Sequence, residues 1–96
     1  MRLTDEQLTQ FDQQGYLFFP DTFSPDEAAY LRQEADTVYA IDRKEVWRES
    51  SGAARTAFAA HKYNEGFRRL GAHPRLINPV EQILGGPVYM HQYKVN

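Results

Sequence analysis

Three polar side chains alternate along the C-terminal end of the sequence, at Gln92, Lys94 and Asn96. Alternate residues of a β-strand point to one face, so a strand over residues 87–96 would bring two amides and an ammonium group together. Such groups could form a pocket wall that recognises a small polar ligand. This face is apolar at Val88 and polar toward Asn96, as expected for a strand that runs from a core into a wet pocket. The solvent-exposed half of an edge strand would give the same pattern, and the sequence leaves both interpretations open.

A second candidate is Arg55, which lies in a mildly apolar stretch that ends at Phe58. A guanidinium group in such surroundings can bind a carboxylate through two parallel hydrogen bonds. The competing interpretation is a surface arginine whose aliphatic stem packs against a sheet. Taken alone, the residue favours that second interpretation.

The three histidines, His61, His73 and His91, do not have the spacing of a metal site. A non-haem iron centre takes two histidines and a carboxylate, and none of the three is followed two residues later by Asp or Glu. We therefore expect no metal ligand and no catalytic residue in this chain. His61 is expected in a loop, His73 at a helix start, and His91 packed and hydrogen-bonded in a strand.

Composition narrows the function classes further. The 96 residues contain no cysteine, which excludes disulfides, zinc–thiolate sites and thiol catalysis. The net charge is -2, with eleven Lys and Arg scattered among thirteen Asp and Glu, so no nucleic-acid partner is expected. The N-terminus lacks the apolar stretch of a signal peptide, and no apolar run is long enough to span a bilayer. These features predict a cytoplasmic protein with no membrane partner.

Two well-marked helices must lie ahead of the candidate residues. Capping boxes at residues 4–7 and 24–27 predict helices that end near Gly15 and Tyr39. Between these helices, the apolar run at residues 16–19 is bounded by Gly and Pro. A short run of this kind predicts a buried or edge strand.

The middle of the chain predicts a hairpin followed by two further helices. Residues 45–49 and 55–59 are expected as antiparallel strands around a polar turn. A short helix should follow over residues 64–71. The next helix begins at either Pro74 or Pro79, since proline suits the first helical position and breaks or kinks a helix interior.

The order of these elements predicts an α+β fold in a single domain. The domain would have a helical region over residues 1–84 and a first core strand over residues 87–96. No Gly, Pro or turn closes the pattern after Asn96. We therefore expect these residues to be the front part of a larger protein.

Three segments in order, GYLFFPDTFSPDE, ARTAFAAH and GGPVYMHQYKVN, resemble the N-terminal part of the phytanoyl-CoA dioxygenase family. The resemblance is greatest to its bacterial branch of ectoine hydroxylases and free amino-acid hydroxylases. It covers nearly all of this chain but only the front part of a typical family member.

The resemblance implies an Fe(II)- and 2-oxoglutarate-dependent dioxygenase built on a double-stranded β-helix, or jelly roll, with N-terminal helices packed outside. In this family the iron is held by a His-x-Asp pair and a distal His, all downstream of the strand that ends at Asn96. The chain is thus expected to be truncated before the metal-binding core, inactive alone and unable to bind either cofactor alone. Its expected partners are the C-terminal portion of the same protein and a small amino-acid-like substrate.

The resemblance also implies roles for the candidate residues. Gln92 matches a Gln that contacts substrate in the ectoine hydroxylase branch. Arg55 and Phe58 fall in the segment that helps line the pocket of relatives, which implies substrate binding. Lys94 and Asn96 share the expected inward face with Gln92 and are the candidates for cofactor binding.

Two alternatives stay open at this point. A twist or bulge in the last strand would turn Tyr93 inward instead. The chain would also suit a non-catalytic module that binds a partner, or forms a homodimer, through the exposed strand at residues 87–96.

Overall fold

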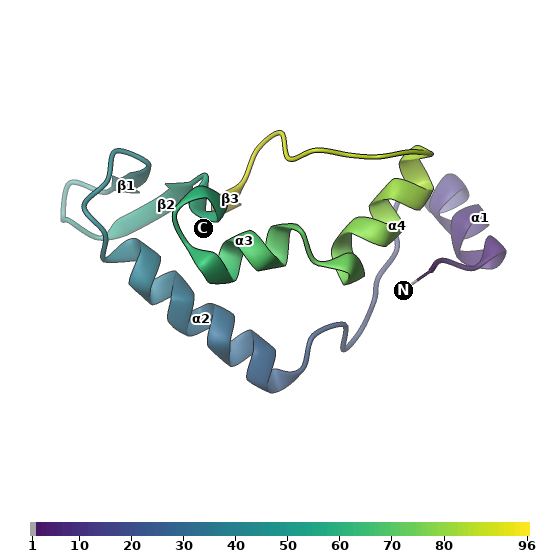
Figure 1. The fold of residues 1–96 in the computed structure, drawn as a ribbon, viewed down its shortest axis with the longest axis horizontal. Helices are drawn as coiled ribbons and strands as arrows, with labels where there is room; N and C mark the ends of the chain where they lie inside the picture. The colour runs from purple at the N-terminus through teal and green to yellow at the C-terminus, as the bar shows by residue number, and fades with distance from the viewer. Residues whose placement is uncertain (1) are drawn as a thin grey trace.

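In the computed structural model, which describes residues 2–96, the chain combines helices with a small sheet, as expected for the α+β class. Figure 1 shows their arrangement. The elements are, in chain order, α1 (Asp5–Gln14), α2 (Pro25–Tyr39), β1 (Val46–Arg48), β2 (Ala54–Phe58), a 3-10 helix (Ala60–Lys62), α3 (Glu65–Gly71), α4 (Pro74–Leu84) and β3 (Lys94–Val95).

Both predicted capping boxes are present. The Thr4 hydroxyl accepts a hydrogen bond from the Gln7 N–H at 3.1 Å, and the Ser24 hydroxyl accepts one from the Glu27 N–H at 3.1 Å. Each cap satisfies a backbone N–H that the first helical turn leaves without a partner. Gly15, with φ of 84°, ends α1 in the left-handed conformation that glycine adopts without steric cost.

Helix α4 begins at Pro74, the first of the two predicted starts. His73 is its N-cap, because the imidazole Nδ1 accepts a hydrogen bond from the Arg75 N–H at 3.1 Å. This confirms the expected position of His73 at a helix start. Pro79 lies inside α4 and is buried, and the helix continues through it to Leu84.

The predicted strand over residues 16–19 is wrong. These residues form an irregular connection between α1 and α2, and no strand of the described residues runs beside it in Figure 1. Tyr16 and Phe18 are 62% and 79% exposed. An apolar run becomes a strand only where a second strand can satisfy its backbone groups.

The predicted hairpin is confirmed, and it carries a third strand. β1 pairs antiparallel with β2, with Val46 opposite Ala57, and β2 pairs antiparallel with β3, with Ala57 opposite Val95. The side chains of Val46 and Ala57 are buried with Val38 and Phe67, and Val95 packs against this cluster. The core therefore lies between the sheet and helices α2 and α3.

The expected strand over residues 87–96 is shortened to Lys94–Val95. Residues 87–93, which we call the crossing segment, are irregular and run from the end of α4 to the sheet (yellow-green to yellow in Figure 1). The segment begins at Pro87, which has no N–H to donate to a ladder. Only the residues after the crossing segment reach β2 and pair with it.

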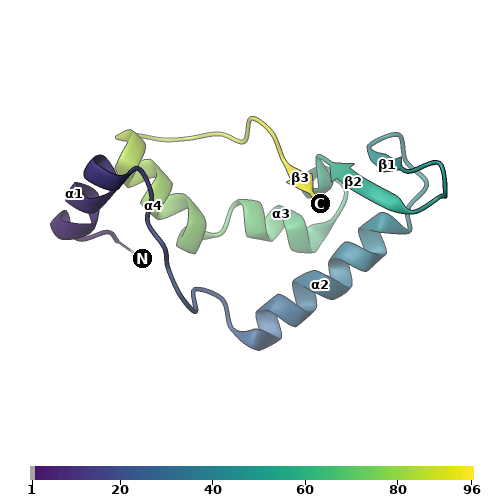
Figure 2. The same ribbon diagram turned by 180° about the vertical axis from the view of Figure 1, so that it is seen from behind.

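The molecule is elongated and open. Figures 1 and 2 show α1 beside α4 at one end, the sheet at the other end and α2 along one side. At the first end, the Gln82 side chain accepts a hydrogen bond from the Leu3 N–H at 2.8 Å and donates one to the Leu3 carbonyl at 2.9 Å. The radius of gyration is 15.8 Å, whereas a compact domain of this length has about 12.5 Å.

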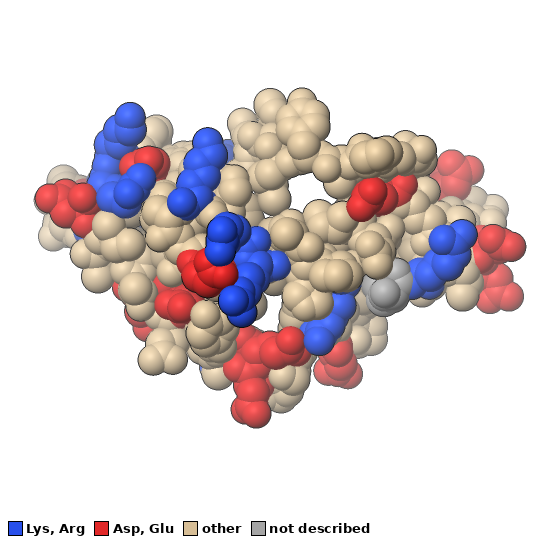
Figure 3. Space-filling view, viewed as in Figure 1, with Lys and Arg blue, Asp and Glu red and all other residues tan. Residues whose placement is uncertain are grey.

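Charged side chains of both signs are interspersed over the face shown in Figure 3. This distribution agrees with the small net charge of -2. Within residues 2–96, no helix combines the length and the apolar character needed to cross a membrane.

An ion pair joins the start of α2 to the start of α4. The Arg75 Nη1 donates to both carboxylate oxygens of Glu27, at 2.8 and 3.0 Å, and to the Thr22 carbonyl at 3.1 Å. The Ser24 N–H donates to the same carboxylate at 2.8 Å. The hydrogen bonds from Arg75, and after them the one from Ser24, lower the pKa of Glu27 from 4.5 to about 2. Both side chains are 39% exposed, so solvent weakens the pair.

We expect the chain to lose stability as the pH falls from 4.5 toward 2, because Glu27 then takes up a proton and releases Arg75. A carboxyl group with a lowered folded-state pKa contributes stability that is fully present above its unfolded pKa and is lost as the pH falls through its folded pKa. Melting temperatures measured between about pH 2 and 6 test this. Glu27→Gln and Arg75→Met should each reduce the pH dependence, and the double variant should reduce it no further. A wild-type slope in both single variants would contradict the role of this pair.

Candidate functional site

A groove of about 560 Å³ runs along β3, between this strand and helices α3 and α4. Gln92, Lys94 and Asn96 all line it, and all three are exposed. The three polar residues singled out in the sequence therefore meet along one groove. Because β3 is the last strand of the sheet order β1-β2-β3, this wall of the groove is the edge of the sheet.

The other wall of the groove is apolar. Its residues come from α3, α4 and the crossing segment: Phe67, Leu70, Leu76, Val80 and Met90. Leu76, Val80 and Met90 remain 38%, 41% and 41% exposed. Figure 3 shows the molecule hollowed beneath the crossing segment. A groove with one apolar and one polar wall suits a small ligand that has an apolar body and a polar head.

Strands β2 and β3 bring Phe58 next to Lys94, its partner in the ladder. The Lys94 Nζ lies 5.7 Å from the centre of the Phe58 ring, a distance at which a cation is attracted to an aromatic face. Trp47 packs on the same ring at 4.7 Å between ring centres and is 54% exposed. Farther along the ladder, the Thr56 hydroxyl donates to Asn96 Oδ1 at 2.9 Å. These contacts place Phe58, Lys94 and Asn96 together on the side of the sheet away from the core.

Arg55 does not join this group. It lies where the register of the β1–β2 pair shifts, and its side chain is 66% exposed. Its Nε lies 3.9 Å from Glu49 Oε1. An exposed pair at this distance contributes little to stability. The position agrees with the interpretation of Arg55 as a surface residue.

The two other histidines differ in their surroundings. His91 is exposed and lies outside the strands, so the expectation of a packed strand residue is wrong. His61 belongs to the 3-10 helix that follows β2. Its ring stacks on Tyr93 at 4.7 Å, and its Nδ1 is buried with no hydrogen-bond partner among residues 2–96.

Tyr93 is a structural residue whose importance the sequence did not reveal. Its hydroxyl donates to the Phe67 carbonyl at 2.8 Å, and burial raises the pKa of that hydroxyl. Tyr93 and Val95 pack against the core, and both also line the groove beside β3. The alternative in which Tyr93 turns into the ligand pocket stays a prediction. The available signal was the alternation itself, because an apolar Tyr93 and Val95 on one side leave Lys94 and Asn96 on the other.

The described residues do not fit an iron site. In the part of the chain that the structure describes, no three or more side chains of His, Asp or Glu come together in a group that could hold a metal ion. The residues do fit one end of 2-oxoglutarate, which the family resemblance implies. An ammonium group at Lys94 and an amide at Asn96 are suitable donors for a carboxylate.

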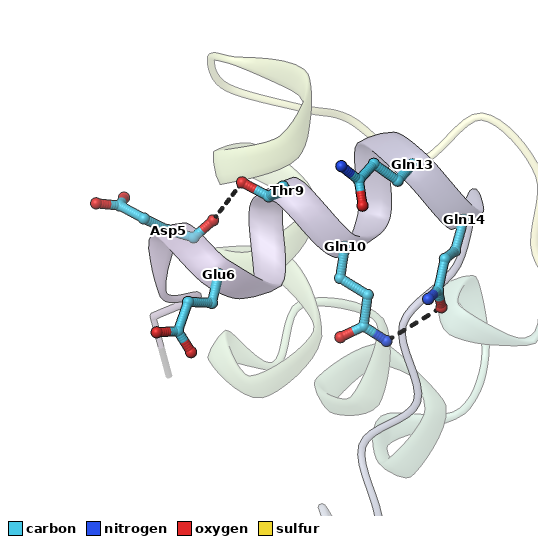
Figure 4. Close-up of a pocket in the computed structure, with 6 residues that line it drawn as sticks. All are labelled: Asp5, Glu6, Thr9, Gln10, Gln13 and Gln14. Carbon is cyan, nitrogen blue, oxygen red and sulfur yellow. Dashed lines mark hydrogen bonds between the residues drawn. The ribbon is translucent and has the colours of Figure 1, made fainter.

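A polar recess on α1 is a weaker candidate. Figure 4 shows that its six labelled side chains all belong to this helix and point in different directions. The hydrogen bonds drawn are local ones, from the Thr9 hydroxyl to the Asp5 carbonyl and from the Gln10 amide to Gln14. A binding site needs groups that converge on one point, and the side chains of this recess do not converge.

Known proteins are similar in sequence to this chain over nearly its whole length. The family Phytanoyl-CoA dioxygenase (PhyH) matches residues 11–96. An ectoine dioxygenase of Stutzerimonas stutzeri is 40% identical over 96 residues, which are 95% of this chain and 32% of that protein. An L-proline trans-4-hydroxylase of Streptomyces griseoviridis is 38% identical over 88 residues, which are 91% of this chain and 33% of that protein. The chain thus spans about a third of the length of these relatives.

The comparison of folds leads to the same group of proteins as the comparison of sequences. A crystal structure of EctD from S. alaskensis with 2-oxoglutarate and 5-hydroxyectoine matches with a TM-score of 0.85 and 31% identity, over 98% of this chain and 35% of that chain. The helices and the small antiparallel sheet are therefore a shared arrangement. Because the family match covers most of the sequence and the fold match covers nearly all of it, this chain belongs to the phytanoyl-CoA dioxygenase family.

Proposed function

We propose that the polypeptide to which these residues belong is an Fe(II)- and 2-oxoglutarate-dependent hydroxylase of a small amino acid or related metabolite. The observation that carries this proposal is the joint match, in sequence and in fold, to ectoine dioxygenases. The neighbouring EctD structure contains 2-oxoglutarate and a hydroxylated small molecule, which supports the cofactor and the product class. A non-catalytic partner-binding module is not favoured, since the named relatives are dioxygenases and a hydroxylase.

In this proposal the chain contributes binding groups and no metal ligand. Iron and 2-oxoglutarate together supply the oxidising chemistry for attack on a C–H bond. Lys94 and Asn96 hold a carboxylate of 2-oxoglutarate at the polar wall of the groove. Gln92 and Phe58 contact the substrate, one through its amide and the other through its ring. Arg55 is the least supported member of the predicted set, because its side chain lies beside Glu49.

The fold of the intact protein is proposed as follows. Strands β1 to β3 are the first strands of a double-stranded β-helix, and the four α-helices pack outside it. Residues 1–96 are the N-terminal part of one catalytic domain, and its C-terminal portion covers the groove that is open here. The intact protein is cytoplasmic. A homodimer through residues 87–96 is tested separately, by measuring the oligomeric state of the intact protein in solution.

The test is to express the continuous reading frame that contains these residues. We expect a His-x-Asp pair downstream of Asn96, and iron-dependent formation of succinate when 2-oxoglutarate is supplied with ectoine or L-proline. Omission of iron and chelation of iron are the controls. A reading frame that lacks the His-x-Asp pair, or a polypeptide that forms no succinate with any small amino acid, would remove the enzyme proposal.

The 96-residue chain alone is expected to form no succinate. A non-haem iron centre requires two histidines and a carboxylate, and residues 2–96 contain no such group. The purified chain is incubated with Fe(II), 2-oxoglutarate and O2, and succinate is quantified against the longer polypeptide at equal concentration. Iron-dependent succinate from the short chain would show that this expectation is wrong.

A further inference from the structure

Tyr93 is held on several sides at the end of the crossing segment. Its hydroxyl donates to the Phe67 carbonyl at 2.8 Å, and its ring stacks on His61 at 4.7 Å. The edge of the Phe67 ring approaches at 6.3 Å between ring centres. The Tyr93 carbonyl accepts a hydrogen bond from the Ala59 N–H at 2.7 Å. Tyr93 therefore ties the crossing segment to α3 and to the end of β2 at the same time.

Gly71 makes this position of Tyr93 possible. A Cβ atom at Gly71 would lie 2.8 Å from Cε2 of Tyr93, closer than real Cβ atoms approach. It would also lie 3.2 Å from Cε of Met90, which is tighter than most Cβ contacts. The backbone of Gly71 is helical, so the position requires a missing side chain and not a special φ angle. Glycine is a poor helix former, and the close approach of the Tyr93 ring gives it a reason to end α3.

Strand β3 is too short to set its own register. It pairs through Lys94 opposite Phe58 and Val95 opposite Ala57. A slip by one residue would turn Lys94 toward the core and Val95 away from it, because successive strand residues point to opposite faces. The fixed position of Tyr93, immediately before the strand, excludes that slip.

We propose that Gly71 and Tyr93 form a clamp that sets the register of β3 and thereby aims Lys94 and Asn96 at the ligand. Both are positioning residues, since they act through the two polar side chains that follow. This inference rests on the proposed function for its ligand, 2-oxoglutarate. The mechanical part, the link between Gly71 and the pairing of β3, stands on the contacts alone.

The mechanical part is tested by amide hydrogen exchange on this chain. Gly71→Ala adds one methyl group against Tyr93. Gly86→Ala is the matched control, because a Cβ there meets no atom within 4 Å and its φ is not positive. The Ala59 N–H bonds to Tyr93, whereas the Phe58 N–H bonds to Glu45 in the β1–β2 pair. We expect Gly71→Ala to speed exchange at Ala59 on the order of tenfold relative to Phe58, and Gly86→Ala to leave this ratio unchanged.

Three results of the exchange experiment would overturn the clamp. They are equal acceleration at both amides in Gly71→Ala, no acceleration at either, and no protection at Ala59 in the unmodified chain. Tyr93→Phe guards against a variant that simply fails to fold, because it removes only the hydroxyl bond to Phe67. It should raise exchange at Ala59 less than Gly71→Ala does. A larger effect from Tyr93→Phe would show that the hydroxyl, and not the close approach to Gly71, fixes the strand.

The ligand part is tested in the longer polypeptide. Gly71→Ala should raise the KM for 2-oxoglutarate on the order of tenfold, with a smaller change in kcat, because β3 must return to register before the ligand binds. Gly86→Ala should keep both constants. A lower kcat with an unchanged KM in Gly71→Ala would refute the positioning role. If the unmodified polypeptide forms no succinate, the proposed function fails, and the exchange result still decides the clamp.

Discussion

Replacing Lys94 by Met in the longer polypeptide, the proposed hydroxylase, is expected to raise the KM for 2-oxoglutarate about 10- to 100-fold. A hydrogen bond from a charged donor contributes about 1.5–3 kcal/mol, and each 1.36 kcal/mol corresponds to a factor of ten. Met keeps an unbranched side chain beside Phe58 and removes the charge that Lys94 places 5.7 Å from that ring. Succinate formation, measured over a range of 2-oxoglutarate concentrations, gives the constant.

Arg55→Met is the matched control, because it removes the same charge from the other candidate cation. Arg55 is 66% exposed and lies 3.9 Å from Glu49, so we expect its removal to leave the KM for 2-oxoglutarate unchanged. Lys94→Arg should restore part of the affinity, since it returns a positive donor to β3. A large effect at Arg55 with none at Lys94 would place the carboxylate site on the β1–β2 hairpin and contradict the proposed role of Lys94.

The helix starts were predictable because each is determined by residues close together in the sequence. Ser24 and Glu27 form their capping box within one helical turn. Asn64 and His73 cap α3 and α4 through bonds to the first residues of those helices. No distant part of the chain has to be known for such signals to be read.

The strands were less predictable because their pairing partners are distant in the sequence. The apolar run at residues 16–19 has the composition of a strand, yet it runs where no other strand of the described residues lies beside it. Residues 87–93 alternate correctly but meet β2 only at their end. The exposure of Arg55 depends on a register shift between β1 and β2, which no local pattern encodes.

The candidate site likewise has one feature that local sequence predicts and one that depends on distant residues. The alternation of Gln92, Lys94 and Asn96 predicted a shared face, and the structure gives the three residues a common groove. The contact that holds this face in place could not be found from the sequence. Tyr93 is fixed by contact with Gly71 on another element, and a glycine at the end of a helix reads as an ordinary stop signal.

The second large effect is expected at Phe67, where replacement by Ala should remove the cooperative unfolding transition of the chain. Phe67 is 6% exposed and lies at the centre of a small core with Val38, Val46 and Ala57. Truncating a buried Phe to Ala costs about 3–5 kcal/mol, whereas whole domains are stable by about 5–15 kcal/mol. Thermal and urea unfolding followed by circular dichroism measure the change.

Phe18→Ala is the control for Phe67→Ala, because it removes the same side chain where 79% of it is exposed. We expect it to change the free energy of unfolding by less than about 0.5 kcal/mol. Phe67→Leu should fall between the two, since it keeps most of the apolar volume. Because the Phe67 carbonyl also accepts the Tyr93 hydroxyl bond, the loss of Phe67 packing should release β3 as well as the core. A Phe67→Ala chain that unfolds cooperatively at the wild-type temperature would mean that the α1–α4 end, held by Gln82, carries the stability instead of the sheet end.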